Sequence, residues 1–292
     1  MEIFAQQLVN GLIIGGVYAL IAVGLTIIFG LMDVVNFAHG EFYMLGGMIA
    51  FLLVQAVGAN YFLCLVLSIA LVMAIGFLVE RALLKRLRDK KTEILVTAAL
   101  VTIGVSIFLQ NTGLLVFGSV PRLIPSPFSS EPFRVGPILL GRMHLFAALV
   151  TFIVILFCHF FIKKTTLGMA MRATFQDKDV AALVGVHIDR VFSFTFMLGA
   201  GLAATAGALL GPIYIIYPNV GESVVLKAFV IVILGGMGNF FGAIFAALLL
   251  GVVESLGAAY MAVEFRDLIG FVMVLLILLF RPSGLFGKMK RV

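Results

Sequence analysis

Residues 42–79 read FYMLGGMIAFLLVQAVGANYFLCLVLSIALVMAIGFLV, a stretch of 38 residues without Asp, Glu, Lys or Arg. A helix needs about 20 apolar residues to cross a hydrocarbon core of roughly 30 Å, so this stretch is long enough for two crossings. The residues at 58–60 (Gly-Ala-Asn) predict the break between them. Strands of a membrane barrel would alternate apolar and polar residues, and this stretch does not. We therefore predict transmembrane helices at 40–57 and 61–79.

The remainder of the chain is also rich in long uncharged runs. Four further uncharged runs occupy 3–32, 94–121, 143–162 and 191–221. Of the 292 residues, 63% are hydrophobic and 12% are charged, whereas soluble domains carry roughly 25% charged residues. The composition excludes a cytosolic enzyme, a secreted disulfide scaffold and a disordered chain, and it predicts an integral membrane protein. We expect no cleavable signal peptide, because the first apolar run is too long and no basic segment precedes it.

Basic residues indicate the orientation. They gather in the connections 80–91 and 163–190 and in the C-terminal tail, which the positive-inside rule assigns to the cytoplasm. We predict an all-α polytopic bundle of about eight spans that forms one domain over 1–292, with the N-terminus outside and the C-terminus cytoplasmic. The predicted spans lie near 8–31, 40–57, 61–79, 94–117, 143–162, 191–211, 224–261 (two passes) and 266–280.

The segment 224–239 allows two interpretations. Only 11 residues, 224–234, precede Gly235-Gly236-Met237-Gly238, which is too short for a full crossing. A re-entrant helix is tolerated in a membrane when protein surrounds it. A crossing is favoured by the basic tail, which must end in the cytoplasm.

Motifs of soluble enzymes are absent from the sequence. It has no phosphate loop, no H-E-x-x-H and no G-x-S-x-G. Its four histidines fall in four different segments, and Cys64 and Cys158 lie inside apolar runs. We predict that the chain is not an enzyme, holds no metal or cofactor and binds no nucleic acid. Any ATP that it uses must be held, with Mg, by another subunit.

Two groups of polar residues interrupt the apolar runs. The first is the segment 33–41, DVVNFAHGE, which either forms a plain cytoplasmic turn or marks a transport path, because polar groups at membrane depth are costly. The second is Lys227 with Glu254, which lie at comparable depth in neighbouring predicted helices. We expect these two to form an intramembrane ion pair, or else Lys227 to extend towards the interface.

The connection 163–190 predicts two short helices. Thr166 is expected to cap the first, over 167–175, and Asp177 the second, over 178–184, which ends at Gly185. We expect one apolar side of the second helix to hold Val180, Ala181 and Val184. Two capped helices in one loop favour a docking surface, and the alternative is an amphipathic linker on the membrane surface.

Several stretches carry a family resemblance. DVAALVG at 179–185 resembles the E-A-A-x-x-x-G coupling motif of bacterial ABC importer permeases, with Ala181 and Gly185 in place and Asp179 for the glutamate. GLIIGGVYAL at 11–20, NFAHGE at 36–41, LGGMGN at 234–239 and RPSGLFG at 281–287 resemble branched-chain amino acid permeases of the LivH type. The resemblance covers about residues 5–287.

The resemblance implies an ABC importer permease in the bacterial inner (cytoplasmic) membrane that carries leucine, isoleucine and valine. Its implied partners are a homologous permease of the LivM type, two ATPase subunits that bind ATP and Mg, and a periplasmic substrate-binding protein. Contact with the ATPase is expected from Arg172, Asp177, Asp179, Ala181 and Gly185. The cytoplasmic end of the path is expected to be lined or gated by Asn36, His39 and Glu41.

Other functions remain open at this point. The same machine could carry another small substrate, such as a different amino acid, an amide or urea. An ion-coupled secondary transporter would need a carboxylate near the midplane, for which only Glu254 is placed. A channel would need a polar lining, which only 33–41 offers.

Overall fold

The computed structural model describes residues 2–57, 60–88, 94–128, 131–136, 138–261 and 265–287. These residues are mainly helical, as the apolar runs predict. The described long helices begin and end within about four residues of the predicted spans, except that the first begins at Glu2 rather than at residue 8. The long helices are α1 (Glu2–Met32), α2 (His39–Val57), α3 (Tyr61–Val79), α5 (Ile94–Phe117), α6 (Arg142–Lys164), α9 (Ile188–Leu210), α10 (Val220–Gly235), α11 (Phe240–Tyr260) and α12 (Arg266–Phe280). The short elements are η1 (Glu80–Leu84), α4 (Lys85–Arg88), α7 (Thr166–Gln176), α8 (Lys178–Leu183) and the hairpin of β1 (Phe133–Val135) with β2 (Ile138–Leu140).

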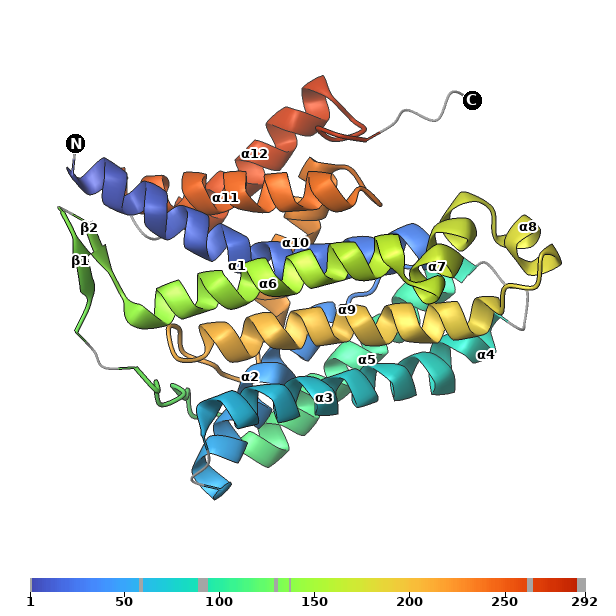
Figure 1. The fold of residues 1–292 in the computed structure, drawn as a ribbon, viewed down its shortest axis with the longest axis horizontal. Coiled ribbons are helices and arrows are strands. Elements are labelled where there is room, and N and C mark those ends of the chain that lie inside the picture. The colour runs from blue at the N-terminus through green and yellow to red at the C-terminus, as the bar shows by residue number, and fades with distance from the viewer. Residues whose placement is uncertain are drawn as a thin grey trace.

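Six helices in the described part of the chain are long and apolar enough to cross a membrane. They are α1, the continuous helix from α3 to α4, α5, α6, α9 and α11. In Figure 1 α1 begins at the same end of the bundle as the β hairpin. The last described residue, Gly287, packs against Gly236, and the nearby Gly238 packs against the ring of Phe175 in α7. The described chain thus begins and ends at opposite ends of the bundle, while the orientation and the number of crossings stay predictions.

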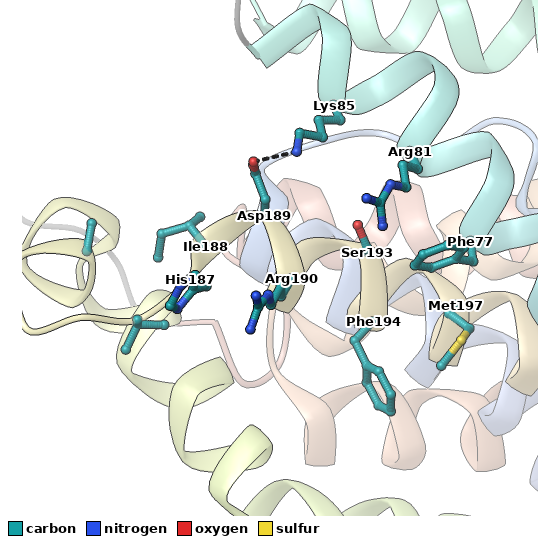
Figure 2. Close-up of a pocket in the computed structure, with 12 residues that line it drawn as sticks. Phe77, Arg81, Lys85, His187, Ile188, Asp189, Arg190, Ser193, Phe194 and Met197 are labelled. Carbon is teal, nitrogen blue, oxygen red and sulfur yellow. Dashed lines mark ion pairs between the residues drawn. The ribbon is translucent and has the colours of Figure 1, made fainter.

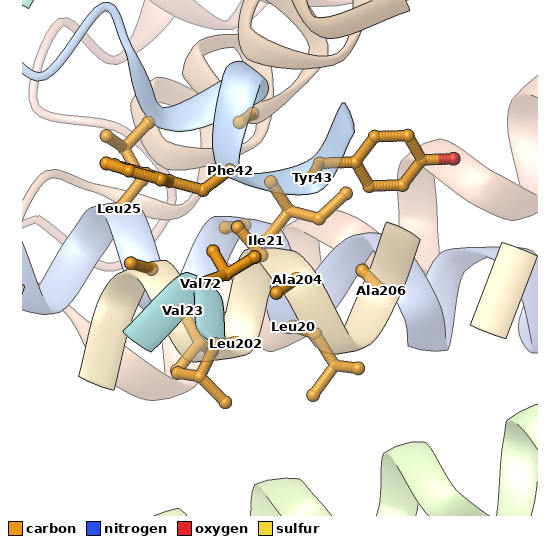
Figure 3. Close-up of a cluster of buried hydrophobic side chains, with 14 of the residues drawn as sticks. Leu20, Ile21, Val23, Leu25, Phe42, Tyr43, Val72, Leu202, Ala204 and Ala206 are labelled. Carbon is orange, nitrogen blue, oxygen red and sulfur yellow. The ribbon is translucent and has the colours of Figure 1, made fainter. Parts of the chain in front are cut away.

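Helices α1 and α9 form the centre of the bundle. Buried residues make up 72% of the apolar window in α1 and 83% of that in α9, but only 17% to 28% in α3, α5 and α6. The outer helices therefore leave most of their surface uncovered by the rest of the chain. Figure 3 shows the core where side chains of α1, α2, α3 and α9 meet, among them Leu20, Phe42, Val72 and Leu202.

Small residues bring the central helices into backbone contact. A Cβ atom on Gly24 would lie 2.8 Å from the carbonyl oxygen of Gly199, and one on Gly15 would lie 2.7 Å from that of Ala247. Gly46 packs in the same way against the backbone of Ala204. In lipid, close packing rather than the hydrophobic effect drives helix association. The G-x-x-x-G spacing of Gly11 and Gly15 thus serves packing of α1 on α11 within the chain.

Helix α2 begins in the interior of the bundle. Helix α1 ends at Met32, but His39 Nε2 donates to the carbonyl oxygen of Ile21 at 2.9 Å. Ile21 lies 11 residues before the end of α1, a distance of about 16 Å along a helix. Residues 33–38 have no helical or strand structure and carry the chain back along α1 to this depth. We call residues 33–38 the strap.

Helix α10 begins at the same place. A Cβ on Gly40, in the first turn of α2, would overlap the carbonyl of Gly221 in the first turn of α10. The 16 residues of α10 are about 24 Å long, and they end at Gly235, which packs against Gly242. Helix α10 thus starts inside the protein, and whether 224–239 cross the membrane or re-enter stays a prediction.

Tight packing of α2 on α9 predicts unequal tolerance of two helical glycines. We expect Gly207→Ala to lower stability by roughly 1–3 kcal/mol, because the new Cβ would overlap the carbonyl of Tyr43, a backbone atom. The matched control is Gly104→Ala in α5, where nothing lies within 4 Å of the added Cβ. There we expect unchanged or slightly raised stability. Thermal unfolding of the purified protein in detergent measures both, and equal melting temperatures would contradict the packing.

Candidate functional site

The strap and the start of α2 bring together the polar residues of the segment 33–41. Asn36 and His39 have no exposed surface, and Glu41 is 1% exposed. Asn36 Oδ1 accepts a hydrogen bond from the backbone N–H of Ala38 (3.1 Å), which fixes the turn into α2. Glu41 Oε1 accepts from Ser106 Oγ at 3.1 Å. Because Ser106 lies near the middle of α5, this cluster is at mid-depth.

Asn36, His39 and Glu41 therefore lie deeper in the bundle than the expected cytoplasmic end, and the segment is not a plain surface turn. The physical reason is the strap. Thr102 Oγ1 accepts from the N–H of Phe37 (3.2 Å), and its one hydroxyl proton is shared between the carbonyls of Val35 (3.1 Å) and Ala99 (2.9 Å). Thr102 thus supplies partners that extended backbone needs inside a membrane. The role of the three residues in transport stays a prediction.

Three polar atoms of this cluster remain unsatisfied. Asn36 Nδ2, His39 Nδ1 and Glu41 Oε2 are buried and have no hydrogen-bond partner among the described residues. A buried polar atom without a partner costs about 1–3 kcal/mol, so proteins rarely keep several together without a use for them. They offer one amide donor, one imidazole acceptor and one carboxylate oxygen.

Glu41 also faces the first turn of α10. A Cβ on Gly221 would lie 2.6 Å from Glu41 Oε2, so the carboxylate rests against this helix's N-terminal backbone. The positive end of a helix dipole stabilises a nearby carboxylate. Two helix N-termini and one carboxylate thus meet at mid-depth, an arrangement that transporters use where discontinuous helices contact substrate.

Lys227 and Glu254 lie close to this cluster. Lys227 Nζ donates to Glu254 Oε1 at 2.8 Å, and Tyr18 Oη donates to Glu254 Oε2 at 3.2 Å. The ammonium group of Lys227 also lies 5.6 Å from the ring centre of Tyr18. Glu254 is 1% exposed and Lys227 is 21% exposed. The structure thus brings the two charges together across α10 and α11, beside a tyrosine of α1.

The connection 163–190 forms two short helices, α7 and α8. Thr165, not the expected Thr166, caps α7, because Thr165 has extended backbone and its Oγ1 accepts from the N–H of Gly168 (3.0 Å). Asp177 caps α8 through two hydrogen bonds of 2.9 Å, from the N–H groups of Asp179 and Val180. Gly185 follows the end of α8 with a φ of +90°, a left-handed conformation that favours glycine.

The exposed surface of α8 differs from the expected one. Only Ala181 of the predicted apolar side is buried, at 2% exposed, while Val180 is 54% and Val184 is 73% exposed. The reason is that α8 is only six residues long and its small Ala181 faces the protein. Leu183, which the sequence analysis missed, is 86% exposed. Val180, Leu183 and Val184 together form an apolar tip that the bundle presents to its surroundings.

Helices α7 and α8 contact the segments that lead to the buried cluster. Lys178 pairs with Asp33 at the start of the strap. A Cβ on Gly30, near the end of α1, would lie 2.9 Å from the ring of Phe175, and one on Gly238 would lie 3.4 Å from it. Arg172 donates to the carbonyl of Ile162 and so ties α7 to the end of α6.

Three contributors to the cluster were missed from the sequence: Thr102, Ser106 and Tyr18. Thr102 and Ser106 are four residues apart, so they share one face of α5. Two hydroxyls on one face of an apolar helix were a usable signal, since such residues bond across helices in membranes. Tyr18 gave no comparable signal.

Comparisons with known proteins give a consistent result. The family described as "Branched-chain amino acid transport system / permease component" matches residues 7–279. The high-affinity branched-chain amino acid transport system permease protein LivH of Salmonella typhimurium is 38% identical, over 98% of this chain and 96% of its own length. BraD of Pseudomonas aeruginosa, with the same description, is 38% identical over the same shares. LivM of Escherichia coli is 28% identical, over 92% of this chain and 67% of its own length.

A solved structure is also similar to this chain. PsaBC from Streptococcus pneumoniae in complex with Fab aligns with 97% of this chain and 94% of its own, at 14% sequence identity and a TM-score of 0.49.

The pair of Lys227 and Glu254 predicts a coupled effect on stability. Glu254→Gln leaves a partly buried ammonium without its carboxylate, and we expect a loss of about 3 kcal/mol, the lower end for buried pairs because Lys227 keeps some exposure. The double variant Lys227→Met, Glu254→Gln should recover most of this loss. Melting temperatures of the purified variants measure the coupling, with the exposed Lys164→Met as control. If the double variant loses as much stability as the two single variants Lys227→Met and Glu254→Gln together, the two residues do not stabilise the protein as a pair.

Proposed function

Since this chain belongs to the family of permease components of the branched-chain amino acid transport system, we propose that it is the membrane-spanning permease subunit of an ATP-driven importer for leucine, isoleucine and valine. The observation that carries the proposal is 38% identity over nearly the whole chain to permeases with this description. ATP-driven uptake of labelled leucine into proteoliposomes that hold the assembled complex tests it. If the complex takes up a different amino acid but not leucine, isoleucine or valine, the assignment as an importer permease stands and the proposed substrate is wrong.

The chain works with partners in this proposal. A second permease is supported by the similarity of this chain to LivM, another permease protein of a high-affinity branched-chain amino acid transport system. Two ATPase subunits hold ATP and Mg, and a periplasmic binding protein delivers the substrate. The chain itself is a transport subunit in the bacterial inner membrane, and its part in the cycle is to move in response to the ATPases.

The apolar tip of α8 is the proposed ATPase contact. Val180, Leu183 and Val184 are largely exposed at the end of the molecule that the positive-inside rule assigns to the cytoplasm. Exposed apolar groups that project from a small helix favour contact with another protein. Arg172, Asp177, Asp179, Ala181 and Gly185 hold the two helices in shape or flank the tip.

The mid-depth cluster is the proposed gate. An amino acid crosses the membrane as a zwitterion, so it needs partners for an ammonium and for a carboxylate while its apolar side chain passes apolar walls. Glu41 Oε2 and His39 Nδ1 would accept from the ammonium, and the N-terminal turns of α2 and α10 suit the carboxylate. The cluster is closed in this structure, since Asn36, His39 and Glu41 are at most 1% exposed. Opening therefore requires α2 and α10 to move apart.

An ion-coupled carrier is disfavoured by the surroundings of Glu254. A coupling carboxylate must be available to its ion, whereas both oxygens of Glu254 are engaged, by Lys227 and by Tyr18.

The proposed contact through the apolar tip predicts that a charge placed in the tip weakens association with the ATPase subunits. We expect Leu183→Glu to weaken co-purification of the ATPase subunits and to abolish the ATPase activity stimulated by substrate and binding protein, because a charge replaces an apolar contact. The matched control is Leu123→Glu, also an exposed leucine (54%), on the loop between α5 and β1. The double variant Asp179→Arg, Gly185→Leu should act like Leu183→Glu. Full stimulation in these variants would show that the coupling assignment is wrong.

The gate predicts a loss of uptake with assembly intact. Glu41→Gln removes a charge-assisted hydrogen bond to the passing ammonium, worth about 1.5–3 kcal/mol, so we expect leucine uptake to fall on the order of tenfold or more. Binding of the ATPases should not change, because Glu41 lies far from α8. The matched control is Gln55→Glu, near the other end of α2. It exchanges the same two side chains in the reverse direction. Equal uptake by Glu41→Gln and wild type would exclude Glu41 from the path.

A further inference from the structure

A second site lies on the outer side of the bundle, away from the gate. A cavity of about 810 Å³ opens between α3, η1 and α4 on one side and α9 on the other, and residues at and after the end of α8 close its third side (Figure 2). Its volume is in the range of small-molecule sites. The helix from α3 to α4 makes one wide turn here, at Glu80–Leu84, and such π turns are frequent at functional sites.

The polar part of the cavity is cationic. Arg81, Lys85 and Arg190 line it against one carboxylate, Asp189. That carboxylate is already shared, since Lys85 lies 3.0 Å and Arg88 3.4 Å from its oxygens. Arg81 and Arg190 pair with no carboxylate in the described part of the chain. Two guanidinium groups therefore face the cavity with their charge uncompensated.

The apolar part lies one to two helical turns deeper in the bundle. Phe77 precedes Arg81 by four residues on α3, and Phe194 and Met197 follow Arg190 by four and seven residues on α9. Figure 2 shows Lys85, Asp189 and Arg190 towards one end of the cavity and Phe77, Phe194 and Met197 towards the other, with Arg81 between them. Because α4 and the start of α9 belong to the basic connections, the cationic end is the cytoplasmic one.

We propose that this cavity binds an anionic glycerophospholipid of the inner leaflet. Arg81 and Arg190 hold its phosphodiester, for which guanidinium groups are well suited, and an acyl chain lies along Phe77, Phe194 and Met197. Basic pockets between membrane helices at the cytoplasmic side recognise such headgroups. A free phosphate would use only the cationic end, whereas the lipid matches both ends and their order along the helices.

The position of the site ties the lipid to the coupling region. Ala182, in α8, and Val186, just after it, line the same cavity as Arg81. A bound lipid therefore contacts α8 at Ala182, while the apolar tip of α8 stays free. Anionic lipid should stabilise the chain, whereas a zwitterionic lipid with the same acyl chains should not.

The experiment is native mass spectrometry of the full-length chain in detergent, which needs neither transport nor ATPase subunits. Phosphatidylglycerol, phosphatidylcholine with the same acyl chains, and glycerophosphoglycerol are the three probes. We expect one retained phosphatidylglycerol. Each arginine contributes about fivefold to affinity, so Arg81→Gln, Arg190→Gln should weaken retention about twenty-five-fold. The matched control is Arg134→Gln, Arg142→Gln, which removes two exposed arginines at the hairpin end.

Each alternative result overturns the proposal. Equal retention by the two double variants would mean that lipid binds elsewhere. Glycerophosphoglycerol bound as tightly as the lipid would identify a site for a soluble phosphodiester. Loss of ATPase co-purification in Arg81→Gln, Arg190→Gln with lipid retention intact would make the cavity a protein-docking surface. Melting temperatures of both double variants, expected within a degree or two of each other without lipid, check that the fold is kept.

Discussion

Backbone contact between small residues is the constraint on which this bundle depends. Lipid chains are as apolar as leucine, so burial alone does not hold helices together in a membrane. Gly24 against Gly199 joins α1 to α9, and Gly207 against Tyr43 joins α9 to α2. These contacts leave no room for a side chain. They set the spacing of the helices that surround α2 and α10, and thereby the depth at which those two helices begin.

The helices that surround α2 and α10 make it possible for polar groups to lie inside the bundle. Extended backbone exposed to lipid would lose its hydrogen bonds, but the strap finds partners on Thr102. At the start of α2, the side chain of His39 donates to the carbonyl of Ile21. The satisfied groups fix the segment in place. The unsatisfied ones, on Asn36, His39 and Glu41, are left at the point where the two helix N-termini meet. Polar groups with and without hydrogen-bond partners thus occur side by side within one short segment.

The sequence predicts the helices well because length and apolarity are local properties. The predicted span 40–57, for example, matches α2, which runs from His39 to Val57. The depth of the strap is not a local property, since Asn36 and Gly40 suit a turn in water as well as one inside a protein. Its partners on α1 and α5 decide it. The cap on Thr165 rather than Thr166 reflects two adjacent residues of equal capacity, which only the path of the backbone distinguishes. The exposed Val184 follows from the shortness of α8.

The contacts of α7 and α8 suggest how a push at the tip reaches the gate. The pair of Lys178 and Asp33 is a weak link, because both side chains are partly exposed and such pairs contribute about 0–1 kcal/mol. Phe175 provides an apolar contact to Gly30 and Gly238. Gly30 precedes the strap and hence α2, while Gly238 follows α10 directly. The strap itself is short and cannot lengthen much, since extended chain reaches at most about 3.6 Å per residue. One ring thus touches the segments that lead to both interior helices, so a displacement of α7 would act on the two sides of the proposed gate together.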